Sequence, residues 1–128
     1  MNALITGIHH ISLNTASDAE YRRVRAFYAE LLGLPVAAEW ATGCLLDTGA
    51  GRIEIINNGR EPLPQGVLRH FAFAVADADA CADTVRAAGY VVTVEPKDVV
   101  LGSEPPLPAR IAFCRGPLGE EIEFFAER

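Results

Sequence analysis

The sequence lacks long apolar runs, and it has no cluster of basic residues. Its apolar stretches are far shorter than the roughly 20 residues that a membrane-spanning helix needs, so no membrane role is expected. The net charge is −6, and Lys and Arg are scattered along the chain. Because affinity for nucleic acid depends largely on basic patches, a nucleic-acid partner is not expected either.

Paired cysteines and a secretory signal are also missing. The three cysteines, Cys44, Cys81 and Cys114, stand singly without CxxC spacing. An odd number of isolated thiols favours buried small hydrophobic side chains in a reducing compartment. The first residues, 1–6, lack the basic stretch and long apolar core of an export signal, so we expect a cytoplasmic protein.

The composition is that of one folded domain. The chain has 128 residues, of which 50% are hydrophobic and 22% charged. A domain of this length buries about two thirds of the surface that its unfolded chain exposes. We therefore expect a single domain over residues 1–128 that needs no disulfides.

The first half of the chain predicts a strand, a helix and three more strands. Residues 7–14 alternate so that Ile11 and Leu13 share one face while His10 lies on the other. Ser17 and Glu20 fit a capping box at a helix start. The helix carries an apolar stripe at helical spacing, and a glycine is placed to end it. The expected strands and the glycine are 35–40, 44–47, 52–56 and Gly33.

The second half repeats this order of elements. Asp77 is placed to cap a helix that runs to Ala88, and Gly89 is placed to end it. The expected strands are 67–75, 90–94, 109–114 and 120–126. Gly102 and three prolines interrupt residues 98–108, which we interpret as a loop. The chain thus predicts an α+β fold of two βαβββ modules, about 1–60 and 66–128, with helices on the outer face of a cleft-like mixed β-sheet.

Four strand-like fragments each carry one side chain that can bind a metal. These side chains are His10, Glu54, His70 and Glu123, so that each half offers His and then Glu. Successive side chains of a strand point to opposite faces. The flanking residues can therefore pack into the core while the four polar side chains face a shared concave sheet.

At these fragments the chain resembles the vicinal oxygen chelate superfamily, which includes glyoxalases, bleomycin-resistance proteins and extradiol dioxygenases. The matching stretches are 9–13, 51–55, 68–72 and 116–124. The resemblance implies that His10, Glu54, His70 and Glu123 bind a divalent metal. Imidazole and carboxylate suit Zn, Ni, Co, Mn or Fe, and a metal would relieve repulsion between two close carboxylates. The alternative is that the two Glu are ordinary solvent-facing residues and the two His are satisfied by local partners.

The resemblance implies a metal-dependent lyase or isomerase similar to glyoxalase I, acting on a hemithioacetal or a related substrate with vicinal oxygens. Glu54 or Glu123 would move the proton, with Glu123 favoured because Glu120 and Glu121 are close. The segment after Glu54 lacks the aromatic and asparagine-tryptophan features of glutathione-using members. Two alternatives stay open: a drug-sequestering binding protein of the bleomycin-resistance type, and an epimerase acting on a thioester.

Four further residues, His9, Trp40, Arg69 and Arg110, are weaker candidates. His9 is expected to face away from His10 and to pack, and Trp40 could line the cleft or fill the core. Arg69 and Arg110 could meet an anionic substrate, although a surface role is favoured for both. The high apolar fraction and the open strand edges predict a homodimer that binds a small-molecule substrate. Whether the cleft forms within one chain or between two stays open.

Overall fold

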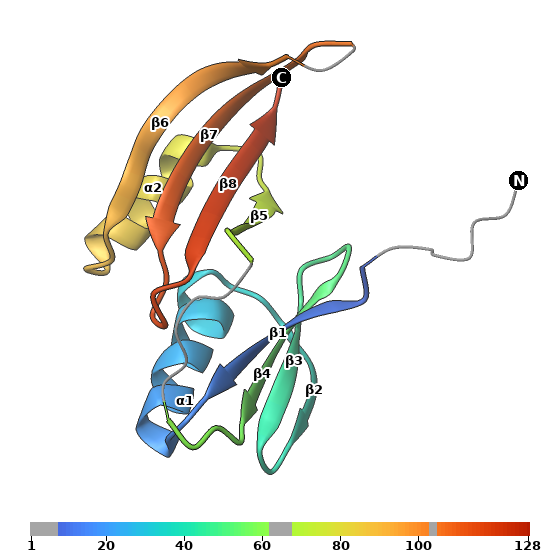
Figure 1. Cartoon of the computed structure of the whole chain (residues 1–128), viewed down its shortest axis with the longest axis vertical. Coiled ribbons are helices and arrows are strands. Elements are labelled where there is room, and N and C mark those ends of the chain that lie inside the picture. The colour runs from blue at the N-terminus through green and yellow to red at the C-terminus, as the bar shows by residue number, and fades with distance from the viewer. Residues whose placement is uncertain (1–7, 62–67, 103–104) are drawn as a thin grey trace, which may run out of the picture. The chain divides into compact units, whose positions relative to one another are not determined.

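The computed structural model describes residues 8–61, 68–102 and 105–128. The chain divides into two compact units, Met1–Pro64 and Gln65–Arg128. Each unit is a four-stranded mixed sheet with helical structure on one face, as Figure 1 shows. The predicted α+β fold of two βαβββ modules is confirmed.

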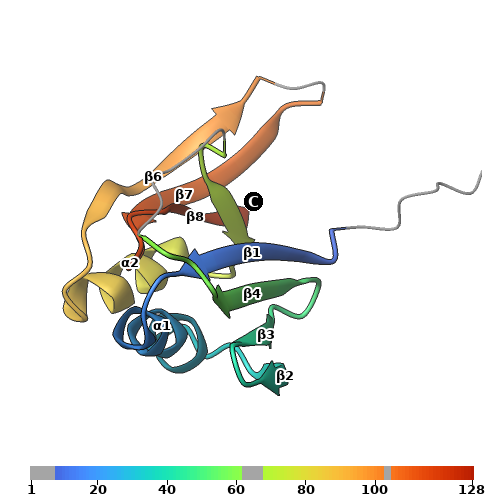
Figure 2. The same ribbon diagram turned by 60° about the horizontal axis from the view of Figure 1, so that its bottom comes forward.

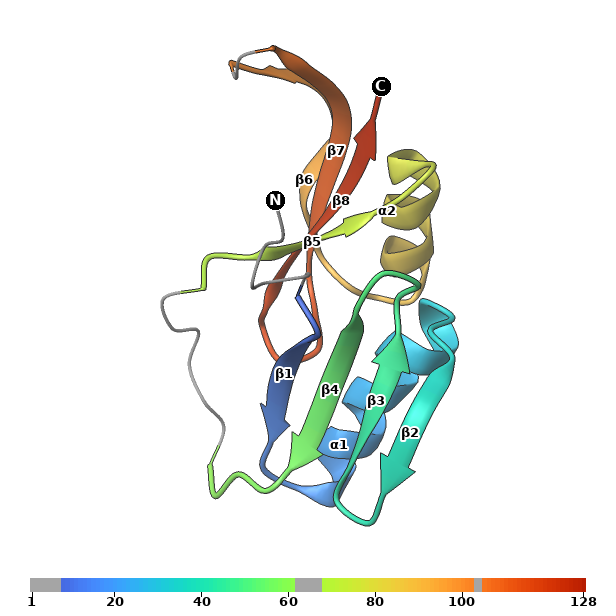
Figure 3. The ribbon, with the colours of Figure 1, turned by 90° about the vertical axis from the view of Figure 1, so that its right-hand side faces the viewer.

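The described part of the first unit contains two helical segments and four strands. They are β1 (His10–Thr15), α1 (Asp18–Arg25), η1 (Ala26–Leu31), β2 (Val36–Trp40), β3 (Gly43–Asp47) and β4 (Arg52–Asn57). The strand order is β1-β4-β3-β2, with β1 parallel to β4 and the other neighbours antiparallel, and Figure 3 shows the four strands side by side in front of α1.

The predicted first helix is confirmed, with a change of pitch near its end. The Ser17 hydroxyl accepts a hydrogen bond from the Glu20 amide at 3.1 Å, as a capping box requires. The last turns, η1, are π-helical, and the Leu32 amide donates to the Phe27 carbonyl at 3.0 Å. Gly33 ends the helix with φ of 75°, a value that residues with a Cβ rarely adopt. The apolar stripe of this helix covers one face of the sheet, where Val24, Phe27, Tyr28, Cys44, Leu46, Ile53 and Ile55 are buried.

One helix and four strands make up the described residues of the second unit. They are β5 (Phe71–Ala74), α2 (Ala78–Ala87), β6 (Val92–Leu101), β7 (Leu107–Arg115) and β8 (Glu121–Glu127). The strand order is β5-β8-β7-β6, and β5 is parallel to β8. In Figure 2 α2 lies on one side of this sheet. Asp77 caps α2, since its carboxylate accepts from the Ala80 amide at 3.0 Å.

The prediction of a loop at residues 98–108 is wrong, because β6 continues to Leu101 and β7 begins at Leu107. Proline is tolerated where no ladder hydrogen bond is needed. Pro108 pairs only with β6, just beyond the end of β8, and its carbonyl accepts from the Arg128 amide at 3.0 Å. Pro96 lies within the register shift between Val94 and Lys97. The two strands therefore form a longer hairpin than the glycine and prolines suggest.

The first strand of the second half is shorter than the prediction of 67–75. β5 spans Phe71–Ala74, so His70 lies just before the strand, and Val67 lies outside the described residues. Among the described residues no helix has the length and apolar character needed to cross a membrane.

The buried-thiol prediction is confirmed for two of the three cysteines. Cys44 and Cys114 are buried, Cys81 is half-buried, and all three are free. Burial raises the pKa of the Cys114 thiol to about 12 and also raises that of Cys81. These thiols therefore stay protonated at neutral pH, as expected for small hydrophobic side chains.

Candidate functional site

The open face of the first sheet brings His10 and Glu54 together. Ser12 on β1 pairs with Glu54 on β4, so the side chains of residues 10, 12 and 54 share the face opposite the helix. His10 Nε2 lies 3.7 Å from Glu54 Oε1. The side chain of His10 is 38% exposed and that of Glu54 only 16%. This carboxylate is thus held close to an accessible imidazole.

Ser12 is a site residue that sequence reasoning missed. Its hydroxyl donates a hydrogen bond of 2.8 Å to Glu54 Oε1, the same oxygen that faces His10. The alternation of β1 could have found it, because position 12 shares the face of position 10. The hydroxyl therefore orients the Glu54 carboxylate.

The second unit brings together His70 and Glu123 in the same way. His70 Nε2 lies 3.2 Å from Glu123 Oε1, and the imidazole packs edge-to-face on Phe113 with ring centroids 5.1 Å apart. Glu123 is 9% exposed. Its partner on β5 is Ala72, at the position that Ser12 occupies in the first unit. Glu123 thus lacks the serine hydroxyl that holds Glu54.

Each unit therefore places one imidazole nitrogen beside one carboxylate oxygen. Within residues 8–61, 68–102 and 105–128, no three His, Cys, Asp or Glu side chains gather closely enough to hold a metal ion. Each pair alone supplies two donors, fewer than the four that most protein zinc sites use. The donor types fit a divalent transition metal, and both histidines face their carboxylates through Nε2.

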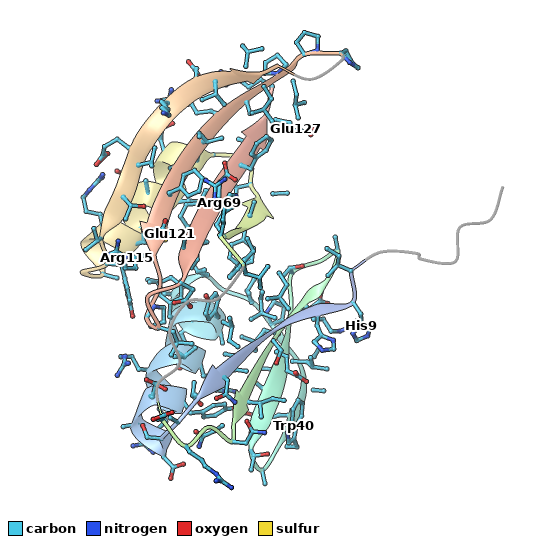
Figure 4. All side chains as sticks on the ribbon, viewed as in Figure 1. His9, Trp40, Arg69, Arg115, Glu121 and Glu127 are labelled. Carbon is cyan, nitrogen blue, oxygen red and sulfur yellow. The ribbon has the colours of Figure 1, made fainter. Side chains whose placement is uncertain are left out.

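His9 does not pack in the core, so that interpretation is wrong. The residue is exposed, its Nδ1 lies 2.8 Å from His10 Nδ1, and its Nε2 lies 3.3 Å from Arg52 Nη1. The backbone just before β1 is not yet in strand conformation, so strict alternation does not apply there. Figure 4 labels His9 at the start of β1. A hollow of about 380 Å³ adjoins it, lined by Ile8, His9, Asp47, Gly49, Ala50, Gly51 and Arg52.

Trp40 lies on the same open face as Glu54, so it does not fill the core. Trp40 pairs with Gly43, Gly43 pairs with Ile56 two residues from Glu54, and the indole is 40% exposed. A methyl group at Gly43 would come within 2.7 Å of the indole ring. The glycine thus lets the indole lie flat on the sheet.

Arg110 is held by two aspartates of its own unit. Its guanidinium makes two hydrogen bonds to Asp79 of α2, at 2.6 and 2.9 Å, and an ion pair with Asp98 at 3.4 Å. The hydrogen bond from Arg110 lowers the pKa of Asp79. Arg69 is exposed, and Figure 4 labels it in the second unit.

The acidic neighbours of Glu123 have their own partners. Glu120 Oε1 accepts from the Leu118 amide at 2.7 Å within its turn. Glu121 accepts from the Thr93 hydroxyl at 3.2 Å and forms an ion pair with Arg115 at 3.8 Å. Both neighbouring carboxylates are therefore oriented by partners other than Glu123.

A second hollow, of about 400 Å³, lies on the open face of the second sheet. Its lining is Ala72, Ala74, Val75, Phe125 and Glu127. Alternation places Phe125 and Glu127 on the same face as Glu123. Ala72, the strand partner of Glu123, therefore lines a hollow that combines four apolar residues with one acidic residue.

Comparison with known proteins gives a family and a set of similar folds. A family model described as Glyoxalase/Bleomycin resistance protein/Dioxygenase superfamily matches residues 7–124. No curated protein matches the chain.

Among solved structures, a glyoxalase family protein from Enterococcus faecalis is 22% identical with a TM-score of 0.69, over 96% of this chain and 99% of that one. TnmS3, an antibiotic binding protein from Streptomyces sp. CB03234, is 20% identical with a TM-score of 0.71, over 99% and 100%. At these identities the likeness shows the fold alone.

Proposed function

Because the chain belongs to the Glyoxalase/Bleomycin resistance protein/Dioxygenase superfamily, we propose that it is a metal-dependent lyase or isomerase similar to glyoxalase I. The reaction moves a proton between adjacent carbons of a hemithioacetal or a related substrate with vicinal oxygens. His10, Glu54, His70 and Glu123 together hold one divalent ion, with the two pairs supplied by one chain or by two copies. Zn, Ni, Co, Mn and Fe all suit this set of donors.

The observation that carries this proposal is the repeated pairing of an imidazole with a carboxylate. His10 Nε2 faces Glu54 at 3.7 Å, and His70 Nε2 faces Glu123 at 3.2 Å. Two carboxylates without a shared role would not be expected to meet a histidine at matching places of two units. The repeat therefore supports a shared role for the four side chains.

The chain's own groups divide the chemistry between them. A divalent ion bound by these residues would act as a Lewis acid toward two neighbouring substrate oxygens. A carboxylate then accepts the proton from the carbon beside the carbonyl and returns it to the next carbon. Glu123 is better suited to this role, since Ala72 leaves its carboxylate free of the hydroxyl that Ser12 offers to Glu54.

We expect the rest of the substrate to bind in the hollow that Ala72, the strand partner of Glu123, helps to line. Its apolar lining residues include Ala72, Ala74 and Phe125, and Glu127 is its acidic one. A substrate with an apolar group next to its reacting carbons would fill it. An epimerase acting beside a thioester carbonyl uses the same proton transfer and is the closest enzymatic alternative.

The second candidate is a binding protein that sequesters a drug-like molecule without chemistry. The same apolar hollow supports it, together with the fold shared with the antibiotic binding protein TnmS3. Such a protein would bind its ligand without a metal. Metal content therefore separates the two candidates.

The experiment is to measure bound transition metal on protein purified without chelator, next to the His10→Ala and His70→Ala variants. We expect one ion for each set of four ligands, that is, for one His10–Glu54 pair and one His70–Glu123 pair. Both variants should lose the ion. His9→Ala is a matched control that keeps both pairs. Drug binding without a metal, unaffected by either His variant, would favour the sequestering protein.

Activity is then tested on adducts of a 2-oxoaldehyde with several small thiols, with the metal at saturation. Turnover that depends on the metal supports the lyase. A protein that binds the metal but turns over none of these adducts would leave the metal site standing and overturn this class of substrate.

We propose a cytoplasmic location for the protein, because its free thiols would stay reduced there.

A further inference from the structure

Four polar groups in the first unit are joined by three successive contacts, and the last two groups are proposed metal ligands. Arg52 Nη1 lies 3.3 Å from His9 Nε2, and His9 Nδ1 lies 2.8 Å from His10 Nδ1. His10 Nε2 in turn lies 3.7 Å from Glu54 Oε1. This series of contacts, called the relay below, therefore runs in the order guanidinium, imidazole, imidazole and carboxylate.

Arg52 fixes the direction of the first contact. A guanidinium carries five donors and no acceptor. His9 Nε2 must therefore accept the hydrogen bond through its lone pair. A neutral imidazole carries one N–H, so the proton of His9 lies on Nδ1.

The second contact then has only one possible direction. His9 Nδ1–H donates to His10, so His10 Nδ1 is the acceptor and the proton of His10 lies on Nε2. This N–H faces the Glu54 carboxylate. In each of these contacts the N–H thus points away from Arg52 and toward Glu54.

This direction is the reverse of the one that metal binding needs. A metal binds an imidazole nitrogen that carries no proton, and the other ring nitrogen then donates to a neighbouring group. Nε2 is the His10 nitrogen that faces Glu54, so it is the ligand atom, and the proton must move to Nδ1. His10 Nδ1–H would donate to His9 Nδ1, and His9 Nε2–H would then meet the Arg52 donor.

We propose that Arg52 and His9 are positioning residues that set the tautomer of His10 and oppose its binding of a metal ion. Release of His9 by Arg52 lets both imidazoles exchange tautomer. The exchange moves protons between ring nitrogens and leaves the net charge unchanged. The metal part of this inference rests on the proposed function, whereas the tautomers are a property of the metal-free chain.

The first test reads the tautomers directly by ¹⁵N NMR of the metal-free protein at about pH 8.5, where imidazole is neutral. Free histidine carries its proton mainly on Nε2, so His9 with its proton on Nδ1 is the diagnostic state. We expect this state in the parent and in Arg52→Lys, which keeps a cation that only donates. In Arg52→Met the His9 proton should return to Nε2.

An Nε2–H tautomer of His9 in the parent, or no difference between the parent and Arg52→Met, would overturn the inference. Both outcomes are readable whether or not the protein binds a metal. Failure of the proposed function is thus distinguishable from failure of the relay.

The second test is a double-mutant cycle on zinc affinity. Arg52→Met should tighten zinc binding about three- to tenfold, the range of one lost opposing hydrogen bond. His9→Phe keeps an aromatic ring beside His10 but breaks the relay. In that background Arg52→Met should give a clearly smaller gain, owed only to the loss of positive charge. Equal gains in both backgrounds would mean that Arg52 acts by charge alone and would contradict the relay.

Discussion

Glu54 and Glu123 occupy matching places in the two units but have different neighbours. Ser12 donates to Glu54, whereas Ala72 stands opposite Glu123. A carboxylate held by a hydroxyl keeps its orientation and is a good ligand. A carboxylate without that hydroxyl is better able to turn toward a substrate proton.

Replacing Glu123 with Gln should therefore lower turnover about 10²- to 10⁴-fold at saturating metal, the usual loss for a general base. Glutamine still offers a carbonyl oxygen to a metal but does not accept a proton at neutral pH. Turnover and metal affinity are measured separately. The matched change Glu54→Gln should weaken metal binding more than it slows turnover, and the reverse pattern would assign the base to Glu54.

At the scale of elements, Arg110 ties β7 to α2 through Asp79. The hydrogen bond from Arg110 lowers the pKa of Asp79 in the folded protein. A carboxyl with a lowered folded-state pKa stabilises the fold above its unfolded-state value. That contribution is lost as the pH falls through the folded-state pKa.

Arg110→Gln should accordingly lower the urea midpoint at neutral pH, and the difference from the parent should shrink once the pH falls below about 3.9, the ordinary Asp value. Urea unfolding of both proteins between pH 7 and pH 2.5 measures this difference. Arg22→Gln, at an exposed position of α1, serves as the control and should show no such trend. A difference for Arg110→Gln that does not vary with pH would contradict the assignment.

Gly43 on β3 is a second point where one element depends on the next. A Cβ there would lie 2.6 Å from the Ile55 carbonyl oxygen and 2.7 Å from the Trp40 ring. Gly43→Ala should destabilise the protein by about 1–3 kcal/mol, as overpacking does. Because Trp40 is the only tryptophan, its emission should also shift to longer wavelength as the indole is pushed into water. Gly102→Ala adds a methyl group in open space and should change neither property.

At the scale of the whole molecule, the edge strands of the two sheets favour association. β6 is an edge strand, and its residues Val100 and Leu101 are 66% and 43% exposed. Apolar edges of this kind are usually covered by a partner. We expect a homodimer at micromolar concentration in light scattering, and a monomer would contradict this prediction.

The sequence alone determined the parts of this protein that depend on local chemistry. Alternation of apolar residues placed Ile11 and Leu13 toward the core and His10 on the open face, and the Ser17 capping box started the first helix. These features need only neighbours a few residues away. The order His, Glu, His, Glu likewise indicated two matching pairs, and each unit brings its own pair together.

The tertiary structure decided what depends on partners far along the chain. Only pairing with β7 keeps residues 98–101 in a strand, and Arg110 reaches Asp79 because α2 packs against β7. The Ser12 bond to Glu54 and the Arg52 contact with His9 join residues 42 and 43 positions apart. Such contacts follow from strand register, which local patterns do not encode because many residues of each type could pair equally well.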